Sequence, residues 1–303
     1  MPDAPPAPPP AAVPALPPGR TDPAYRRDRA RLLARIHRQY ETATEPRRVG
    51  SIDLPFTRIK DPDRVLDQVV EECDRAERLT GVRLEDPQHL PYWAELWDSA
   101  AGVGQVMLEE WGRAGVSENR GVGAKRGESK TDSATPPPRH SDTPTLRYPS
   151  PRILDLGCGM GLTGTIAAAL GGRVLLADIE TPALLFARLN SLPWNVPIGD
   201  GLGGHRPRVR ARRVNWQADD LGERFDLIVG ADILYERKQW EFLDAFWRRH
   251  LAPGGHLLLG EPGRMTGDTF LDWAPARGWH LERRDLKVVT RETPVRVLRL
   301  TLQ

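Results

Sequence analysis

The sequence predicts an α/β protein with a doubly wound, mostly parallel sheet, preceded by a group of N-terminal helices. From residue 151 onward, short apolar segments alternate with helical patterns, which is typical of chains that build parallel sheets. The last two segments, WHLERRDLKVV and PVRVLRLTLQ, instead alternate apolar and polar residues on either side of a short TRET connection. This pattern predicts a C-terminal antiparallel hairpin, so the sheet should end with a reversed strand.

Composition and charge exclude several classes of protein. The 303 residues carry 43 Lys and Arg against 41 Asp and Glu, and this balance gives no global reason to expect binding to nucleic acid or to an anionic membrane. The sequence contains no stretch of 18 apolar residues, so it does not predict a transmembrane helix. Cys73 and Cys158 are too few for a disulfide framework or a cysteine-based zinc site, so we expect a cytoplasmic setting and no metal.

The N-terminal part of the chain divides into a tail and a helical extension. The first twenty residues contain nine prolines, which predicts a disordered tail over residues 1–22. Residues 23–112 are expected to form helices packed on the domain that follows. An amphipathic helix over 25–42 carries arginines on its outer faces, which suit either solvent or an acidic partner. A second helix over 61–79 has an apolar stripe that includes Cys73, so we expect Cys73 to lie in the core. A third helix begins at Asp98 or Ser99.

A low-complexity segment precedes the alternating part of the chain. Residues 113–150 are rich in Gly, Ser, Thr, Pro and charge without an apolar period, which predicts a disordered insert. The main domain is expected over 151–303. Its predicted strands are 152–156, 173–177, 208–214, 225–231 and 255–260, and its predicted helices are 161–170, 181–190 and 237–251. Arginines at alternate positions of strand 208–214 favour an exposed edge strand over contact with nucleic acid.

The turn after the first predicted strand, in ILDLGCGMGLTG, indicates a ligand site. Glycines permit positive φ and let a ligand approach the backbone at a helix N-terminus, and this turn contains Gly157, Gly159, Gly161 and Gly164. The last three also match the G-x-G-x-x-G pattern of dinucleotide-binding proteins. Asp155 argues against that alternative, because its carboxylate would repel a pyrophosphate but attract the ammonium and sulfonium groups of S-adenosylmethionine.

Further positions fit the same ligand. Asp178, at the end of RVLLAD, is placed to accept hydrogen bonds from two ribose hydroxyls, or alternatively to cap the next helix. Trp216 follows the third strand, where it would stack on adenine or pack in the core. Either Asp219 or Asp220 is placed to accept a hydrogen bond from the adenine amino group, and the sequence leaves this choice open.

These residues carry a resemblance to a known class of enzymes. The run Asp155-x-Gly157-x-Gly159-x-Gly161, with Asp178 and the final hairpin, resembles the class I S-adenosylmethionine-dependent methyltransferases. The resemblance covers residues 89–303 apart from the insert. It implies a Rossmann-like, seven-stranded sheet and S-adenosylmethionine as cofactor.

Three further segments resemble a group within that class, the protein-lysine methyltransferases called methyltransferase family 16. They are LWDSAAGVGQVMLEEW over 96–111, NW at 215–216 and GADILYE over 230–236. Asn215 departs from the Asp that relatives often have there, which weakens the assignment of that position. The resemblance implies that the following residues line the cofactor pocket: Trp97, Gly157, Cys158, Gly159, Asp178, Trp216 and Ala231.

The resemblance also implies that Asp232 and Tyr235, the ends of a D-x-x-Y signature, face the methyl acceptor. A lysine amine must lose its proton before it attacks the sulfonium, and an apolar, aromatic slot lowers its pKa. We therefore expect Asp232 to orient a protein lysine, with Tyr92, Trp93 and Tyr235 around its alkyl chain. Asp232 as a helix cap and Tyr235 as a packing residue remain alternatives.

Other acceptors and other functions are weighed against a protein lysine. A small-molecule amine is the second hypothesis, because it would fit the same slot. Nucleic acid comes third, because Ile233 and Leu234 replace both prolines of the D/N-P-P-Y/F loop typical of methyltransferases that act on bases. A module that binds the cofactor without turnover is the last alternative.

Overall fold

The computed structural model describes residues 22–50, 52–81, 90–117, 150–196, 198–199 and 205–302. The predicted tail over 1–22 therefore lies outside the described residues except for Asp22, and so does most of the predicted insert over 113–150. Helix α3 runs from Asp98 to Ser117, so residues 113–117 continue a helix in the range that was expected to be disordered.

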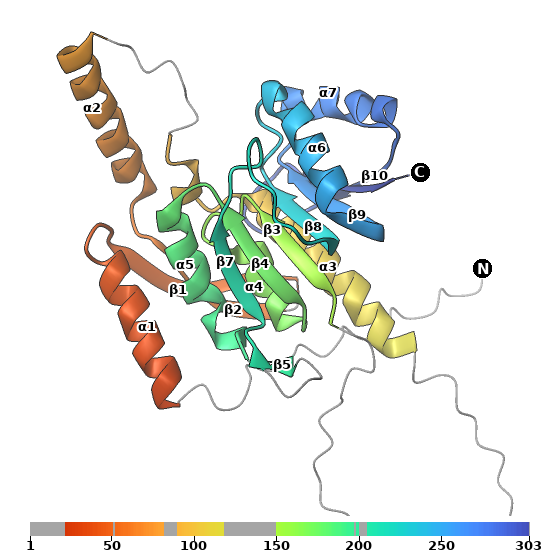
Figure 1. The fold of residues 1–303 in the computed structure, drawn as a ribbon, viewed down its shortest axis with the longest axis horizontal. Coiled ribbons are helices and arrows are strands. Elements are labelled where there is room, and N and C mark those ends of the chain that lie inside the picture. Colours follow the sequence, from red (N-terminus) through yellow and green to blue (C-terminus); the bar gives the residue numbers. More distant parts are fainter. Residues whose placement is uncertain are drawn as a thin grey trace, which may run out of the picture.

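A seven-stranded sheet forms the centre of the molecule, as the sequence and the resemblance predict (Figure 1). Its strand order is β10-β11-β9-β8-β3-β4-β7, and β11 is antiparallel to both of its neighbours. The reversed strand therefore lies second from the edge rather than last. The strands are β3 (Arg152–Leu156), β4 (Arg173–Asp178), β7 (Val209–Arg213), β8 (Phe225–Ala231), β9 (Leu251–Glu261), β10 (Trp279–Leu286) and β11 (Val295–Leu302).

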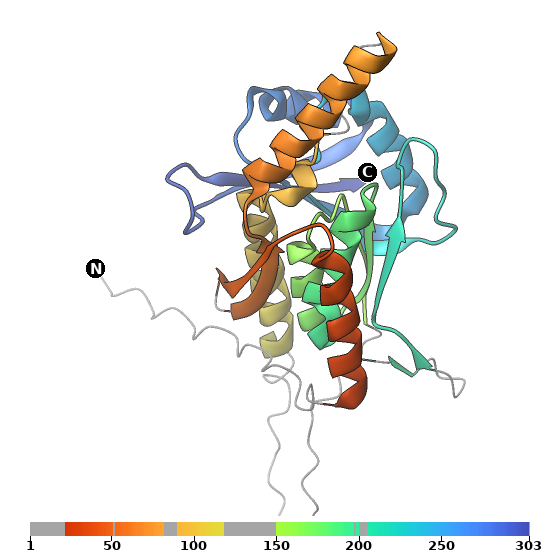
Figure 2. The same cartoon turned by 90° about the vertical axis from the view of Figure 1, so that its left-hand side faces the viewer.

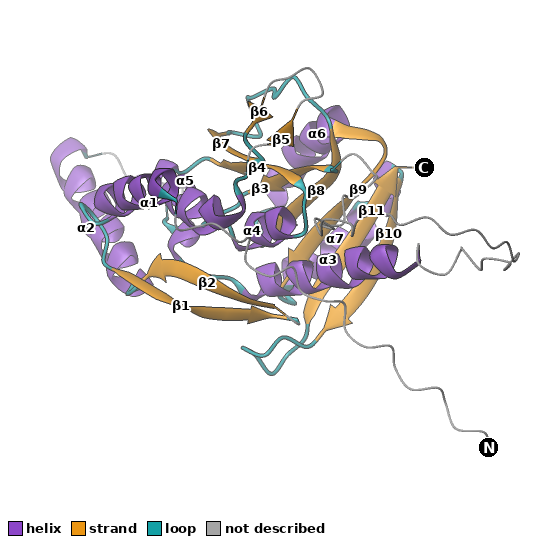
Figure 3. Ribbon diagram, turned by 90° about the horizontal axis from the view of Figure 1, so that it is seen from below, coloured by secondary structure: helices purple, strands orange, loops and turns teal. Residues whose placement is uncertain are grey.

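Helices cover both faces of the sheet (Figure 3). Along β3, Ile153 packs with α3, α4 (Leu162–Ala169) and α5 (Thr181–Ser191), whereas its neighbour Leu154 packs with α6 (Trp240–His250) and α7 (Met265–Trp273) on the opposite face. This is the period-2 alternation of a strand that is buried on both sides. Shorter elements complete the fold: η2 (Tyr92–Ala94), η4 (Leu192–Trp194), β5 (Ile198–Gly199), β6 (His205–Arg206), η5 (Arg237–Gln239) and η6 (Pro275–Arg277).

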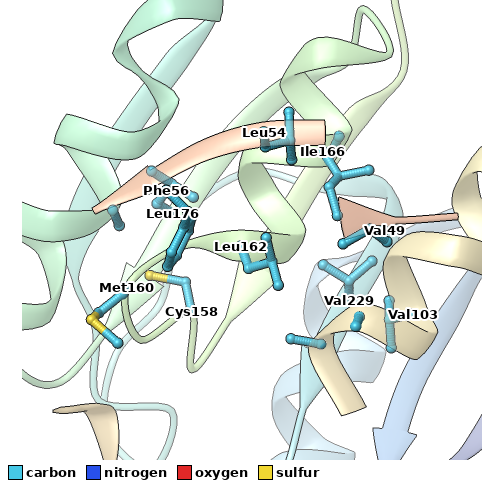
Figure 4. Close-up of a cluster of buried hydrophobic side chains, with 14 of the residues drawn as sticks. Val49, Leu54, Phe56, Val103, Cys158, Met160, Leu162, Ile166, Leu176 and Val229 are labelled. Atoms are coloured by element: carbon cyan, nitrogen blue, oxygen red, sulfur yellow. The ribbon is translucent and has the colours of Figure 1, made fainter. Parts of the chain in front are cut away.

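The N-terminal region contains a β-hairpin that the sequence did not predict. Helix α1 (Pro23–Ile36) ends six residues before the expected end at 42, and β1 (Thr42–Val49) pairs antiparallel with β2 (Ile52–Ile59). Alternate side chains of β2 are buried in the cluster shown in Figure 4, where Leu54 and Phe56 lie near Leu162 and Ile166 of α4. The hairpin therefore joins the core on the α4 face of the sheet.

A buried amide connects this hairpin to the glycine-rich turn. The side chain of Asn190, in α5, accepts from the Thr57 N–H at 2.8 Å and donates to the Thr57 carbonyl at 2.9 Å. The same amide nitrogen donates to the Met160 carbonyl at 2.9 Å. Because Met160 belongs to the glycine-rich turn, the hairpin stabilises the position of that turn through hydrogen bonds in a dry environment.

Helix α2 (Pro62–Thr80) forms where expected, but its apolar stripe does not pack as expected. Only Val65 is buried, while Leu66 and Val70 are 37% and 42% exposed and Cys73 is partly exposed. The expectation that Cys73 lies in a core was wrong, because α2 projects away from the rest of the protein (Figure 2). None of the helices in the described ranges combines the length and apolar character needed to cross a bilayer.

Candidate active site

The glycine-rich turn joins β3 to α4 in a conformation that side chains would oppose. Gly157, Gly159 and Gly161 have φ angles of +64°, +50° and +84°. A Cβ on Gly157 would lie 2.7 Å from Ile233 Cγ2, and one on Gly161 would lie 2.7 Å from Ala187 Cα. Backbone strain and close packing thus both require glycine. At Gly159 a Cβ would meet the Trp93 carbonyl oxygen at an ordinary contact distance of 3.7 Å, so here the positive φ alone favours glycine.

Asp155 is completely buried beneath this turn. Its carboxylate accepts hydrogen bonds from the Thr163 hydroxyl at 3.0 Å and from the Gly164 N–H at 2.7 Å, which fixes the first turn of α4. Burial raises the pKa of Asp155 to about 7, although these hydrogen bonds oppose the shift. The carboxylate therefore acts first on its own chain, and direct contact between Asp155 and a cofactor stays a prediction.

Asp178, at the end of β4, connects the glycine-rich turn to the next helix. It accepts from the Gly159 N–H at 2.8 Å and from the Glu180 N–H at 2.9 Å, and burial raises its pKa to about 6. Burial and the two nearby carboxylates, Asp178 and Asp155, also raise the pKa of the Cys158 thiol. In the described part of the chain neither Asp155 nor Asp178 has a Lys or Arg within 4.0 Å, so the turn lies beside two buried acids without a basic partner.

Trp216 lies beside the same turn. Its ring would be 3.8 Å from a Cβ on Gly157, and its Nε1 donates to the Gln239 side chain at 3.1 Å, which sets the orientation of the indole. The two candidate acceptors for the adenine amino group, Asp219 and Asp220, each already accept a hydrogen bond from a nearby backbone N–H. Asp219 accepts from the Asn215 N–H at 2.8 Å, and Asp220 accepts from the Gly222 N–H at 2.8 Å. The choice between them stays open.

Asp232 follows β8 at the carboxyl edge of the sheet, next to Ala231, the last residue of that strand. It has a φ of +58° and is 8% exposed. The Ser99 hydroxyl donates to its Oδ2, and the Arg264 guanidinium lies 2.9 Å from its Oδ1. Burial raises the pKa of Asp232 to about 6, and Ser99 and Arg264 oppose this shift. A non-glycine residue in left-handed backbone whose buried carboxylate forms an ion pair is typical of a functional position.

Aromatic residues are connected to this ion pair through Arg264 and through one another. The rings of Tyr92 and Tyr235 are 5.8 Å apart, and Arg264 lies over the Trp97 ring at 5.2 Å. The Trp97 indole donates to the Tyr92 carbonyl at 3.0 Å and so connects the two sides. Trp93 does not join this group, because its ring packs between Tyr40 and Phe186. The structure thus brings together Tyr92, Trp97, Asp232, Tyr235 and Arg264, which we call the acceptor slot.

Sequence reasoning missed two members of this arrangement. Ser99 was considered only as a helix cap, yet it is fully buried, because α3 packs tightly against β9: a Cβ on Gly260 would lie 2.7 Å from the Ser99 carbonyl. Arg264 was not considered. Its position depends on Glu261, whose carboxylate accepts the Gly263 and Arg264 N–H groups and so shapes the turn before α7. No local pattern in the sequence marks either residue.

A comparison with protein families places this geometry in context. Residues 96–271 match the family described as lysine methyltransferase, which is more than half of the chain and includes the turn, Asp178, Trp216 and the acceptor slot apart from Tyr92. The chain belongs to this family. The seven-stranded sheet with its reversed β11 is the class I methyltransferase fold that the sequence resemblance predicted.

Curated relatives fall in the same region. EEF1A lysine methyltransferase 3 of Mus musculus is 29% identical over 135 residues, which are 43% of this chain and 54% of that protein. Protein N-lysine methyltransferase METTL21A of Danio rerio is 39% identical over 111 residues, or 36% and 47% of the two chains. A ubiquinone biosynthesis O-methyltransferase of Chelativorans is 30% identical over 138 residues, or 43% and 50%. The match thus spans about half the length of each relative.

Proposed function

We propose that this protein is an S-adenosylmethionine-dependent methyltransferase that methylates a lysine amine of a protein substrate. One observation carries the proposal. At the carboxyl edge of the sheet, a buried carboxylate, Asp232, holds a cationic side chain at 2.9 Å in a slot with aromatic walls. The same geometry suits a lysine side chain, whose apolar chain packs against rings while its nitrogen meets the carboxylate.

The glycine-rich turn fits the proposed cofactor. Its glycines carry no side chain that would keep a ligand away from the backbone, and the two buried acids, Asp155 and Asp178, have no basic partner within 4.0 Å in the described ranges. A cation there would be attracted, and a diphosphate would be repelled. Asp178 is proposed to bind the ribose hydroxyls, and Trp216 to stack on the adenine. When bound, S-adenosylmethionine supplies an electrophilic methyl group on a positively charged sulfur.

The residues of the acceptor slot are proposed to prepare the amine. A lysine amine has a reference pKa of about 10.4, so it arrives protonated and must release a proton to the solvent before attack. The rings of Tyr92 and Tyr235 are proposed to replace part of the water around the amine, which favours its neutral form. Asp232 accepts a hydrogen bond from the amine and aligns its lone pair. As positive charge develops on the nitrogen during transfer, the same carboxylate stabilises it.

Arg264 is proposed to occupy the acceptor slot when no substrate is bound. In the free protein its guanidinium pairs with Asp232 and lies over Trp97, so the buried carboxylate is never left unpaired. The arginine side chain is 35% exposed and can move outward when a substrate amine replaces it. This exchange of one cation for another keeps the charge of the slot balanced.

Labelling of a cell lysate tests the proposal against its alternatives. Purified protein is incubated with lysate and S-adenosylmethionine that carries a deuterated methyl group, and the products are separated into proteins, nucleic acids and small molecules. The proposal expects label on lysine in a protein, identified by mass spectrometry and strongly reduced with the Asp232→Asn variant. Label confined to small molecules would favour amine N-methylation, and label confined to nucleic acid would favour the third hypothesis. No label in any fraction would favour a binding module.

We also propose a cytoplasmic location for this reaction. Cys73 and Cys158 are both free thiols in the structure, as expected in a reducing compartment.

A further inference from the structure

A second recessed surface lies on the opposite side of the molecule from α7, around the outer edge of strand β7. Helix α1, α5 and β7 lie at this edge of the sheet (Figure 1). Residues of α1, of the end of α5 and of β7 line an open groove of about 1090 Å³. None of the residues of the acceptor slot lines it, nor does the glycine-rich turn. We call this surface the arginine groove. The residues that define its charge are Arg31, Arg35, Arg38, Arg188, Arg210 and Arg212.

The groove concentrates positive charge. Six arginines line it against two acidic residues, Asp28 and Glu223, which leaves four excess positive charges in a chain whose total net charge is +2. Arg210 pairs with Glu223 at 2.7 Å, and Arg31 lies 4.0 Å from Asp28. The other four arginines have no carboxylate within 4.0 Å in the described part of the chain. Unpaired like charges on facing elements repel one another, and an anionic partner would relieve that repulsion.

The floor and the wall of the groove favour a protein segment. Apolar side chains lie between the arginines, among them Leu32, Leu192, Val209 and Leu221. The lining contains no Phe, Tyr, Trp or His on which a nucleic-acid base would stack. Strand β7 is the last strand of the sheet, and in the described ranges no strand pairs with its outer side, so its backbone can bind a peptide.

The direction of strand β7 relates the position of the groove to that of the acceptor slot. Strand β7 is parallel to β4, so its carboxyl end lies at the same edge of the sheet as the ends of β3, β4 and β8. Trp216 follows β7 by three residues. A segment that occupies the groove and follows β7 thus leads towards the edge at which the cofactor and the acceptor amine are proposed to meet.

We propose that the arginine groove binds an acidic segment of the methyl-accepting protein, with apolar residues among its acidic ones. The segment places acidic side chains against the arginines and apolar side chains on the floor. That the acidic segment belongs to the methyl-accepting protein rests on the proposed function. The binding of such a segment does not, because the groove is separate from the acceptor slot.

Peptide binding tests this proposal without any methyl transfer. The probe is a fluorescent peptide of alternating Glu and Leu, measured by fluorescence anisotropy with the full-length protein at low and physiological salt. A matched peptide with Gln in place of Glu and a single-stranded RNA oligonucleotide serve as competitors. We expect the Glu peptide to bind, and the Gln peptide and the RNA to compete at least tenfold less well. We also expect affinity to fall with added salt.

Charge reversal on α1 localises the site. Arg35→Glu in α1 with Arg38→Glu in the turn after it changes two exposed arginines of the groove, and Arg26→Glu with Arg29→Glu makes the same charge change earlier in α1, outside the groove. We expect the first pair to weaken peptide binding at least tenfold and the second pair less than threefold. The proposal is overturned if the wild-type protein does not bind the peptide, if both pairs weaken it equally, or if the RNA binds more tightly. Lysate labelling that fails while the peptide binds would refute the proposed function and leave the groove assignment intact.

Discussion

Replacement of Asp232 by Asn isolates the charge that is proposed to act on the acceptor amine. Asn tolerates the left-handed backbone at φ +58°, whereas Ala would add about 1 kcal/mol of strain there. The amide oxygen can still accept the hydrogen bond from the Ser99 hydroxyl. The substitution therefore removes the negative charge while it preserves the shape of the slot.

The size of the effect follows from the geometry. A full positive charge at the 2.9 Å separation of Arg264 and Asp232 interacts with the carboxylate by about 6 kcal/mol at an effective dielectric constant of 20. If about half of that charge has developed on the amine in the transition state, the loss is about 3 kcal/mol. This corresponds to a rate reduction of about 100-fold.

Single-turnover methylation at saturating cofactor measures this loss, and calorimetry measures cofactor affinity in the same preparation. We expect the rate to fall about 100-fold while the dissociation constant changes less than twofold. Asp285→Asn, which breaks an exposed ion pair with Arg283, is the matched control and should leave both values unchanged. A rate reduction of less than threefold with Asp232→Asn would refute the electrostatic role.

Three further substitutions test the cofactor site. Gly161→Ala should lower the free energy of unfolding by about 3 kcal/mol, because backbone strain and a close contact with Ala187 combine. Gly222→Ala is the control, since Gly222 has a similar φ but open space around it, and it should cost about 1 kcal/mol. Chemical denaturation measures both values. Asp178→Asn should weaken S-adenosylmethionine binding about tenfold in calorimetry, because the amide replaces one acceptor by a donor; unchanged affinity would limit Asp178 to its backbone contacts. Because the pKa values of Asp178 and Asp155 are raised, these two carboxyl groups of the cofactor-free protein bind protons more tightly in the folded state than in the unfolded state. The stability of the protein should therefore fall as pH rises from about 4 to about 7. Asp155→Asn should flatten this fall in melting temperature, and wild-type affinity for the cationic cofactor should rise over the same pH range.

The sheet was predictable because its signals are local. Strands β3 and β8 occupy the predicted residues 152–156 and 225–231, since apolar runs bounded by glycine and charge specify buried parallel strands. The hairpin over Thr42–Val49 and Ile52–Ile59 was missed, because only β2 alternates and its burial depends on contact with α4. For α2 the sequence predicted a buried apolar stripe that the structure leaves largely exposed. Amphipathic spacing predicts a helix but does not show that another surface packs against it.

The candidate site was predictable where one segment supplies its residues. The glycine-rich turn and Asp232 were found in this way, but the local partners of Asp155 were not. The carboxylate that was expected to face a ligand is also bonded to Thr163 and Gly164 of the helix that follows. Arg264 reaches Asp232 from a different loop, across 32 positions of sequence. Such contacts depend on tertiary structure and leave no periodic signal in the chain.

Calorimetric titration with S-adenosylmethionine and, separately, with a nicotinamide dinucleotide tests most directly what the turn from Gly157 to Gly161 accepts. We predict one-to-one binding of the sulfonium compound, with no detectable heat from the dinucleotide. Tight dinucleotide binding together with no heat from S-adenosylmethionine would contradict the assignment of the two buried acids as a cation-accepting environment, and with it the proposed methyl transfer.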